Sequence, residues 1–276
     1  MTSSLSLDRG PTTADAVLEP IVDVCADLYR QGWAENHAGN LSYLLTDAEL
    51  AAFPPIAEDR TIEFEQPFAD LAGLSFVVTA AGSAFRLLVK HPEKHAGVIT
   101  LSDDGASARV VWGFEGGKRP TSELPAHLRG HQERRKVEPD NRVVLHCHPT
   151  NLVAMTHVHE PDEVSLTRSL WATNSESILA VPQGIGVLPW MVCGTDLIGI
   201  ESAEKLRESS IVVWTCHGVL VAGASLQAAM GVVESVEKAA NTWLLTRGGD
   251  RNDITSEQLL ELAAAFDIVP PARFLD

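Results

Sequence analysis

Two histidines at the end of an apolar run are the residues best suited to do chemistry. His146 and His148 follow the run 142–145 and precede Pro149. This pattern is typical of a buried strand that ends at a turn. Because side chains alternate along a strand, the two imidazoles share one face and Cys147 points to the other. One interpretation is that they supply part of a zinc site, since a catalytic zinc ion takes three protein ligands and keeps one position open. The alternative is two histidines that cap a strand through hydrogen bonds, because an isolated His-X-His pattern is weak.

A second apolar run, residues 211–220, also contains a histidine next to a turn former. Here His217 precedes Gly218 and follows Cys216. Two strands that each end in histidine are expected when their ends meet at one point, which favours a metal site that joins His217 to the first pair. Cys216 is a rival ligand, but alternation along the predicted strand places it on the opposite face.

Glu123 is the first candidate for proton transfer. It lies at the start of a predicted helix that continues to Lys136, and either Thr121 or Ser122 is the expected cap. There Glu123 is either a carboxylate favoured by the helix dipole in the first turn or a general base beside a metal ion.

Other titratable residues receive weaker roles. His127 shares a helical face with the glutamate four residues before it, whereas the charges that follow His131 predict a solvated stretch. Glu176 precedes an expected short strand and is either a loop carboxylate or a second acid/base group. His157 and His159 repeat the His-X-His pattern, but in a predicted helix with polar neighbours, so we interpret them as surface residues.

Two stretches rich in small residues have the composition of anion-binding loops. Residues 32–42 lie between a predicted helix and an apolar strand, and residues 79–83 follow a strand and open a short helix. Backbone N–H groups in such loops can bind phosphate. For the first stretch the alternative is an ordinary turn, with Gly39 at a positive φ.

These candidates must be positioned by elements that mix strands and helices without a steady βαβ rhythm. The pattern predicts an α/β fold in three layers, a central and largely antiparallel sheet flanked by helices. We expect one domain over residues 1–276, with a flexible N-terminus (residues 1–12) and a long, irregular surface insertion (residues 46–72).

The composition excludes several classes of protein. The chain has 276 residues, of which 45% are hydrophobic, and a net charge of -16. The negative charge argues against nucleic acid and against anionic membrane surfaces as partners. No apolar run is long enough to span a membrane, no signal peptide is visible, and the four cysteines form no CxxC pair. We therefore expect a soluble, cytoplasmic protein.

Five motifs give the chain a family resemblance. They are GWAENHAGNL from Gly32, PTSELPAH from Pro120, RVVLHCHPTNL from Arg142, GVLPWMVCGTD from Gly186, and His217-Gly218. In order and spacing the chain resembles the class II (zinc-dependent) aldolases of the aldolase/adducin superfamily, and most closely its rhamnulose-1-phosphate aldolase branch.

The resemblance implies a mechanism and an assembly. It implies one Zn²⁺ per subunit held by His146, His148 and His217, with Glu123 as the catalytic acid/base. Glu176 matches a second carboxylate that reaches an active site at a subunit interface, in a homotetramer. The implied reaction is retro-aldol cleavage of L-rhamnulose 1-phosphate to dihydroxyacetone phosphate and L-lactaldehyde, in which zinc stabilises the enediolate as a Lewis acid.

By position, the resemblance places the substrate phosphate among His37, Gly39, Asn40, Gly82, Thr121 and Ser122. The sequence departs from the family pattern at His37-Ala38, where Asn-Gly is usual, and at Ala81, which replaces a hydroxyl-bearing serine. Loss of one donor to a charged group costs about 1–3 kcal/mol, and a protonated His37 would restore positive charge. The departures leave open a related zinc aldolase or an epimerase acting on another, possibly unphosphorylated, ketose. A non-catalytic module like the adducin head domain is the third reading.

Overall fold

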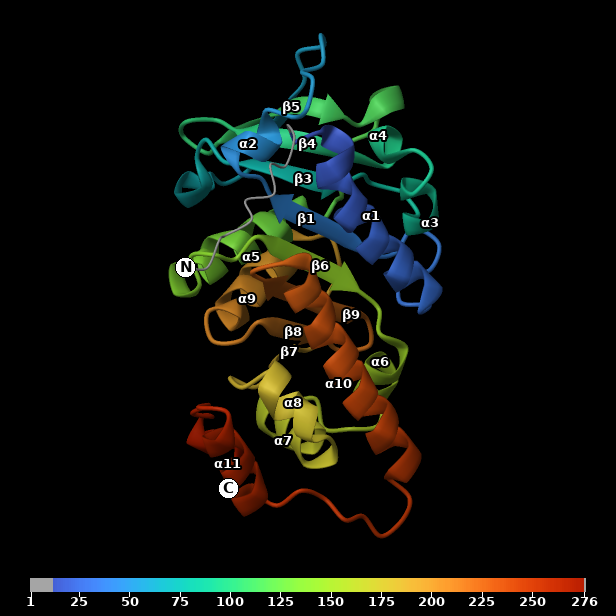
Figure 1. The fold of residues 1–276 in the computed structure, drawn as a ribbon, viewed down its shortest axis with the longest axis vertical. Coiled ribbons are helices and arrows are strands. Elements are labelled where there is room, and N and C mark those ends of the chain that lie inside the picture. Colours follow the sequence, from blue (N-terminus) through green and yellow to red (C-terminus); the bar gives the residue numbers. More distant parts are fainter. Residues whose placement is uncertain (1–11, 276) are drawn as a thin grey trace, which may run out of the picture.

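The computed structural model describes residues 12–275, so the expected flexible N-terminus lies almost entirely outside the described residues. Their strands form one sheet in the order β2-β5-β4-β3-β1-β6-β9-β8-β7 (Figure 1). The strands are β1 (Asn40–Leu44), β2 (Thr61–Glu63), β3 (Ser75–Thr79), β4 (Ala96–Leu101), β5 (Ser107–Gly113), β6 (Val143–Cys147), β7 (Gly186–Leu188), β8 (Ile211–Trp214) and β9 (Gly218–Gly223).

The helices vary from a single turn to 21 residues. They are α1 (Ala14–Arg30), α2 (Asp47–Leu50), α3 (Phe85–Leu88), α4 (Pro92–His95), α5 (Leu124–Val137), α6 (Thr150–Thr156), α7 (Glu163–Thr173), α8 (Ser175–Ala180), α9 (Asp196–Leu206), α10 (Leu226–Thr246) and α11 (Ser256–Ala265). Three short 3-10 turns complete the set: η1 (Ala69–Leu71), η2 (Glu115–Gly117) and η3 (Ala272–Phe274).

Within the described chain, every strand pair is antiparallel except β7 with β8. The predicted, largely antiparallel sheet is therefore confirmed. β6 lies between β1 and β9, in a register that pairs Asn40 with His146 and Cys147 with Val219. This register brings the start of β1 and the start of β9 to the end of β6, where the histidines lie.

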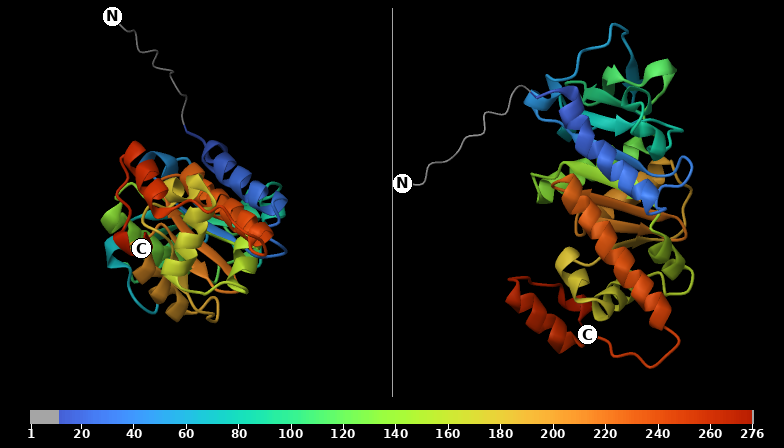
Figure 2. Two further views of the ribbon diagram at one scale, coloured as in Figure 1. Left: turned by 90° about the horizontal axis from the view of Figure 1, so that it is seen from below. Right: turned by 45° about the vertical axis from the view of Figure 1, so that its right-hand side comes forward.

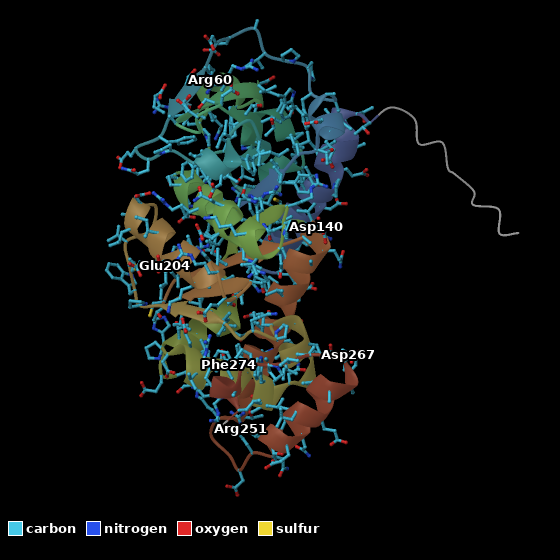
Figure 3. The ribbon with its side chains drawn as sticks, turned by 90° about the vertical axis from the view of Figure 1, so that its left-hand side faces the viewer. Arg60, Asp140, Glu204, Arg251, Asp267 and Phe274 are labelled. Atoms are coloured by element: carbon cyan, nitrogen blue, oxygen red, sulfur yellow. The ribbon has the colours of Figure 1, made fainter. Side chains whose placement is uncertain are left out.

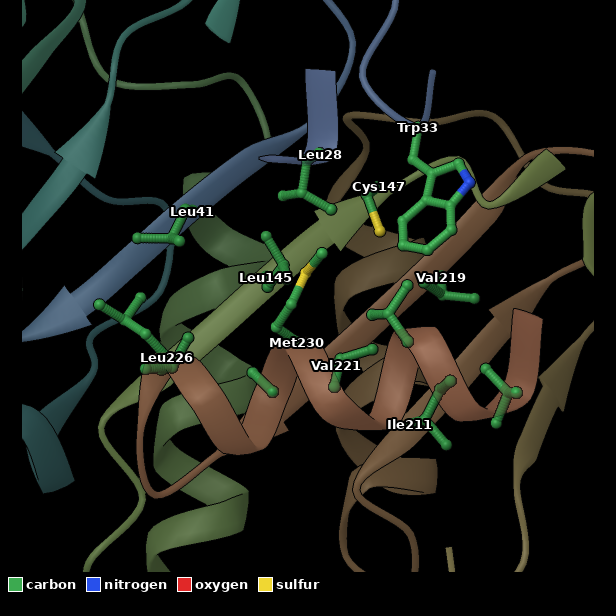
Figure 4. Close-up of a cluster of buried hydrophobic side chains, with 14 of the residues drawn as sticks. Leu28, Trp33, Leu41, Leu145, Cys147, Ile211, Val219, Val221, Leu226 and Met230 are labelled. Atoms are coloured by element: carbon green, nitrogen blue, oxygen red, sulfur yellow. The ribbon is translucent and has the colours of Figure 1, made fainter. Parts of the chain in front are cut away.

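The alternation of side chains on β6 explains the three layers. Leu145 and Cys147 face a core shared with Leu28 of α1 and Met230 of α10 (Figure 4). Val144 faces the opposite side of the sheet, where it packs in a second cluster with residues of α9. Helices α1 and α10 thus cover one face and α5 and α9 the other, which confirms the predicted architecture (Figure 1).

Helix ends follow the sequence signals in several places. Thr13 accepts a hydrogen bond from a backbone N–H of α1, and Ser225 does the same for α10. Thr255 caps α11 in a reciprocal capping box. Pro20 lies inside α1, in its second turn, because the helix begins at Ala14.

Two stretches differ from their predictions. Residues 46–72 are not simply an irregular excursion, because they contain the edge strand β2 and bury Phe53 and Phe68. The apolar run 211–220 is not one strand: the chain reverses in a turn at residues 215–217 and splits it into β8 and β9. A continuous apolar run cannot reveal such a turn when both arms of the hairpin are fully buried.

The C-terminal segment lies at one end of the elongated molecule, beyond α7 and α8 (Figure 2). Figure 3 shows Phe274 at that end with Arg251 and Asp267, far from Arg60 at the other. The Phe274 ring packs edge-on against the buried Trp171 at a centroid distance of 5.4 Å. Among the described residues, no helix combines the length and the hydrophobicity that crossing a membrane requires.

Candidate metal centre and active site

The three predicted histidines lie together at the end of β6. His146 is on β6, His148 follows the strand, and His217 lies in the turn between β8 and β9. Their ring centroids form a nearly equilateral triangle with sides of 5.0, 4.9 and 5.0 Å. Each offers a ring nitrogen within 4.8 Å of the nitrogens offered by the other two.

Hydrogen bonds at the outer nitrogens fix the tautomers of two of these rings. The Nδ1–H of His146 donates to the Val219 carbonyl at 2.8 Å, and the Nδ1–H of His148 donates to the Glu35 carboxylate at 2.9 Å. Both Nε2 atoms therefore carry lone pairs, yet they lie only 3.2 Å apart. Two nitrogens bound to one tetrahedral zinc ion are separated by about 3.3 Å. The pair thus has the spacing that a shared cation requires.

Burial favours the neutral form of two of the three histidines, His146 and His217. Burial, followed by repulsion from His148 and His217, holds the pKa of His146 well below its usual range. Burial also lowers the pKa of His217. For Glu35, burial raises the pKa, but the hydrogen bond from His148 and the other favourable contacts outweigh it and give a net lowering. At neutral pH the site therefore combines the neutral imidazoles of His146 and His217, the form that binds a metal, with the Glu35 carboxylate, which orients the ring of His148.

The turn that carries His217 has a specific backbone requirement. Cys216 has a φ of 59°, and Gly218 lies so close to β6 that a Cβ there would be 2.5 Å from the Cys147 carbonyl oxygen. Only glycine fits at this position, and it brings the hairpin against the end of β6. The strand alternation argument for Cys216 was wrong because this residue lies in a turn. Its Sγ lies 3.6 Å from His157 Nδ1.

Glu123 lies beside the histidine cluster. It is the N-cap residue of α5, so neither Thr121 nor Ser122 caps the helix as predicted. Its side chain is buried, and its Oε2 lies 3.7 Å from His146 Nε2. The same Oε2 accepts a hydrogen bond of 2.7 Å from the side-chain amide of Asn40. A buried carboxylate thus faces the point on which the histidines converge.

A buried hydrogen-bonded chain extends from Glu123 into the protein. Because the Asn40 amide donates to Glu123, its Oδ1 accepts from His127 Nε2–H, and His127 Nδ1 then accepts from the Ser42 hydroxyl at 2.8 Å. The Ser42 oxygen in turn accepts from His131 Nε2–H at 2.9 Å. We call these five residues the relay. Every one is less than a tenth exposed.

The relay corrects the prediction of a solvated stretch around His131, which is fully buried. Its ring packs against Phe76 at a centroid distance of 4.8 Å, and its Nδ1 has no hydrogen-bond partner within residues 12–275. Burial lowers the pKa of His127 to about 4 and holds that of His131 well below its usual range. Both rings are therefore neutral. In the sequence, only two features could have indicated the relay: the four-residue spacing of His127 and His131 on a helix, and the two-residue spacing of Asn40 and Ser42 on a strand.

A cavity of about 170 Å³ opens over this cluster. Its lining includes all six residues predicted for the phosphate, together with Glu123 and the three histidines: His37, Ala38, Gly39, Asn40, Ala80, Ala81, Gly82, Thr121, Ser122, Glu123, His146, His148 and His217. Larger hollows exist, including one of about 910 Å³ at residues 156–169. We place the chemistry in the smaller cavity because buried polar groups converge only there among the described hollows.

Glu176 does not lie where the sequence pattern placed it. It belongs to helix α8 and not to the entry of a strand, because Asn174 accepts its backbone N–H and caps the helix. Its side chain is exposed and does not line the cavity of its own chain. Sequence reasoning also missed Lys118, whose Nζ donates to the Ser83 hydroxyl at 3.1 Å, next to Ala81.

Comparisons with known proteins agree with this geometry. The family described as Class II Aldolase and Adducin N-terminal domain matches residues 19–244. A protein of Listeria monocytogenes named rhamnulose-1-phosphate aldolase is 40% identical over 95% of this chain and 97% of its own. A protein of the same name from Yersinia pestis is 38% identical over 94% of this chain and 96% of its own.

Solved structures show the same fold. A sugar-phosphate aldolase from Thermotoga maritima matches with a TM-score of 0.74 at 27% identity, over 85% of this chain and 96% of its own. An L-fuculose 1-phosphate aldolase matches with a TM-score of 0.60 at 16% identity, over 94% of this chain and 100% of its own. Class II aldolases are generally metal-dependent, in agreement with the histidine cluster. The reading as a non-catalytic module is therefore set aside. This chain belongs to the class II aldolase and adducin family, close to the rhamnulose-1-phosphate aldolases, and is an aldolase, a lyase of carbon–carbon bonds.

Proposed function

We propose that this aldolase cleaves L-rhamnulose 1-phosphate to dihydroxyacetone phosphate and L-lactaldehyde, with one Zn²⁺ held by His146, His148 and His217. The name and the identity of the relatives support the substrate. The observation that carries the proposal is the 3.2 Å separation of two Nε2 atoms whose hydrogens are both on Nδ1. A bound metal ion would supply Lewis-acid stabilisation of the enediolate charge.

Glu123 is the group proposed to move protons in this reaction. After the C3–C4 bond breaks, the enediolate carbon must gain a proton, and in the reverse direction it must lose one. Glu123 is buried and faces the histidine cluster, and it is oriented by the Asn40 amide. Its other oxygen, Oε1, has no hydrogen-bond partner in the described part of the chain, so this oxygen is free to hold the transferred proton.

Backbone amides and one cation are proposed to bind the phosphate. The N–H groups of Gly39, Gly82 and Ser122 have no hydrogen-bond partner among residues 12–275, and all three residues line the cavity. Three N–H groups left without a partner around one cavity can together bind an anion. Lys118 lies next to the loop at Ala81 and contributes positive charge where the serine hydroxyl of the family is absent.

Glu176 is proposed to act in the site of a neighbouring subunit, in a homotetramer. Its exposure, away from its own cavity, fits a contribution across an interface. Mixed oligomers of Glu176→Gln and Glu123→Gln chains test this. If the two carboxylates come from different chains, some sites in the mixture contain both wild-type residues and activity returns. If mixing restores no activity, the two residues do not meet across an interface.

Such an enzyme of sugar metabolism is expected in the cytoplasm.

The substrate assignment is tested with a panel of ketoses, phosphorylated and free, and coupled detection of dihydroxyacetone phosphate. Cleavage of L-rhamnulose 1-phosphate at the highest kcat/KM supports the proposal, and no release from it would overturn it. His37 and Ala81 favour one second candidate, an aldolase or epimerase for another ketose. The same panel separates the two. Glu123→Ala provides the control for mechanism, since it should retain the metal and lose proton exchange on dihydroxyacetone phosphate.

A further inference from the structure

Helix α6 lies between the two chain segments that carry the histidine cluster. It begins at Thr150, and only Pro149, whose ring fixes its φ, separates it from His148. At its other end the helix finishes at Thr156, which contacts the turn that carries His217. A helix of seven residues is about 10 Å long. One element therefore reaches from one proposed metal ligand to another, although none of its residues lines the cavity.

The start of α6 is held by a carboxylate from another helix. Pro149 occupies the N-cap position and has no side chain that could bind the free N–H groups of the first turn. Glu237 of α10, only 5% exposed, binds them instead. Its Oε1 accepts from the N–H and the side-chain amide of Asn151, at 2.9 and 2.8 Å, and its Oε2 accepts from the Leu152 N–H at 2.8 Å. A negative group is favoured at a helix N-terminus, so Glu237 fixes the backbone next to His148.

The end of α6 is bonded to the turn between β8 and β9. The Thr156 hydroxyl accepts the Cys216 N–H at 3.0 Å and donates to the Val153 carbonyl at 2.7 Å. Cys216 has a φ of 59°, a conformation that residues with a side chain rarely adopt, so this hydrogen bond helps to hold it there. Because His217 follows directly, the Thr156 hydroxyl fixes the point from which the His217 imidazole extends.

Between its two ends α6 is packed into the protein. Leu152 and Met155 are fully buried in the same hydrophobic cluster as Val233 of α10, and Figure 1 shows the two helices side by side. The helix therefore cannot shift on its own without losing core contacts.

The His217 ring depends on this support more than the other two rings do. His146 and His148 are oriented by hydrogen bonds from their Nδ1–H groups, to Val219 and to Glu35. Among residues 12–275 the His217 ring nitrogens have no such partner. The position of its backbone must therefore orient the ring toward the other two.

We propose that α6 sets the position of His217 relative to His148, with Glu237 and Thr156 as positioning residues of the metal centre. This proposal rests on the proposed three-histidine site. Partners outside the ligand shell that hold ligating imidazoles in place affect metal affinity without touching the ion. A small displacement of the turn would separate the His217 nitrogen from the other two and weaken binding.

The test compares two substitutions of Thr156 in the full-length protein. Thr156→Val retains the shape of the side chain and removes the hydroxyl, whereas Thr156→Ser retains the hydroxyl. We expect Co²⁺ affinity, measured by competition with a chromophoric chelator, to fall about 10-fold in Thr156→Val and to stay close to the wild-type value in Thr156→Ser. In the metal-free protein, hydrogen exchange at the Cys216 amide should become faster in the valine variant only.

Thr173→Val is the matched control. Thr173 is also the last residue of a helix, α7, and its hydroxyl donates to the Ser169 carbonyl at 2.6 Å and accepts from Arg251 at 2.8 Å. The substitution removes the same number of hydrogen bonds, but outside the cavity lining and away from the histidine cluster. This variant should lose stability and keep its Co²⁺ affinity.

Glu237→Gln tests the other end of the helix. The amide group of glutamine must place its NH₂ against an N–H group of α6, so Co²⁺ affinity should fall here too. Glu234→Gln, at an exposed position of α10, should leave the affinity unchanged.

The outcomes separate this proposal from the metal site itself. If the wild-type protein binds Co²⁺ and Thr156→Val binds it equally well, positioning by α6 is overturned while the metal site stands. Equal weakening in Thr156→Val and Thr156→Ser, or in Thr156→Val and Thr173→Val, also overturns it, because the loss then does not come from the Thr156 hydroxyl. If the wild-type protein binds no Co²⁺, the metal site and the role of α6 are both rejected.

Discussion

Replacement of His127 by phenylalanine tests whether the relay controls Glu123, the proposed catalytic carboxylate. His127 is fully buried and lies outside the cavity lining, so the change removes no direct contact with substrate. Phenylalanine retains the ring but removes the Nε2–H that donates to Asn40 and the Nδ1 that accepts from Ser42. The Asn40 amide is then free to rotate, and Glu123 loses the donor that orients it.

The expected magnitudes follow from these lost partners. A hydrogen bond to a charged group contributes about 1.5–3 kcal/mol, so kcat should fall by about 10- to 150-fold. KM should change less than kcat, because the carboxylate acts in the transition state. The Asn40 side-chain oxygen and the Ser42 O–H are left buried without their partner, which should lower the free energy of unfolding by about 2–6 kcal/mol.

The assay measures ketose cleavage and deuterium exchange into dihydroxyacetone phosphate on protein whose zinc content has been determined. His127→Gln is the matched variant, because its side-chain amide can still donate to Asn40, and it should recover a large part of the exchange rate. The reasoning is refuted if His127→Phe, folded and with its metal bound, exchanges protons at the wild-type rate. It is also refuted if the glutamine variant is slower than the phenylalanine variant.

Three further predictions concern the surroundings of the site. Glu35→Ala should weaken zinc affinity about 10- to 100-fold, because the carboxylate that orients the proposed ligand His148 is lost. Competition with a chromophoric chelator measures the affinity, and Glu58→Ala, at an exposed position, should leave it unchanged. Equal zinc affinities of the two variants would contradict the role of Glu35. Because burial lowers the pKa of His127 to about 4, the unfolded chain binds a proton between about pH 6.5 and 4 that the folded protein does not. The free energy of unfolding should therefore decrease by up to about 3 kcal/mol as the pH falls from 6.5 to 4. Urea unfolding of the metal-free protein at several pH values measures this, and the unfolding free energy should fall less steeply with pH in His127→Gln. If wild type and variant lose stability equally with pH, His127 is not the group responsible. Gly39→Ala should destabilise the protein more than Gly82→Ala. Both glycines have a positive φ, but only at Gly39 would the new methyl group meet neighbouring atoms, at 3.1–3.3 Å. Calorimetry measures the melting temperature of both variants, and an equal decrease would show that packing around Gly39 plays no part.

Local patterns in the sequence predicted much of the fold and the metal cluster. Apolar runs that lead into His146 and His217 identified the ends of buried segments. The turn that bears His217 was not recognised, although Gly218 is a turn former, because the apolar residues on both sides of it have the pattern of one continuous buried strand. Glu176 was placed at the entry of a strand and not in helix α8, because the apolar residues after it are too few to distinguish a short helix from a strand.

The relay could not be predicted because it depends on tertiary packing. His131 is followed by charged residues that are typical of an exposed helix face. In the structure Arg134 reaches the Leu206 carbonyl of α9, and the helix face that carries both relay histidines packs on the sheet. Only the spacing of the polar residues indicated a shared face. Their partners lie more than 80 residues away in sequence, at separations of 85 and 89 for the two contacts of Ser42.

The contact between Phe76 and His131 has a consequence for how mutations in this protein should be interpreted. Phe76 is a fully buried residue of β3, in the hydrophobic cluster beneath α5, and by every usual criterion it concerns stability alone. Yet its ring contacts His131, the last member of a chain of hydrogen bonds whose first member is Glu123, the proposed catalytic glutamate. A shortened side chain there would let the imidazole shift, and the displacement would be felt as a slower reaction in enzyme that is still folded. Substitutions made in this part of the core to raise stability therefore have to be assessed by their effect on turnover as well as on melting temperature.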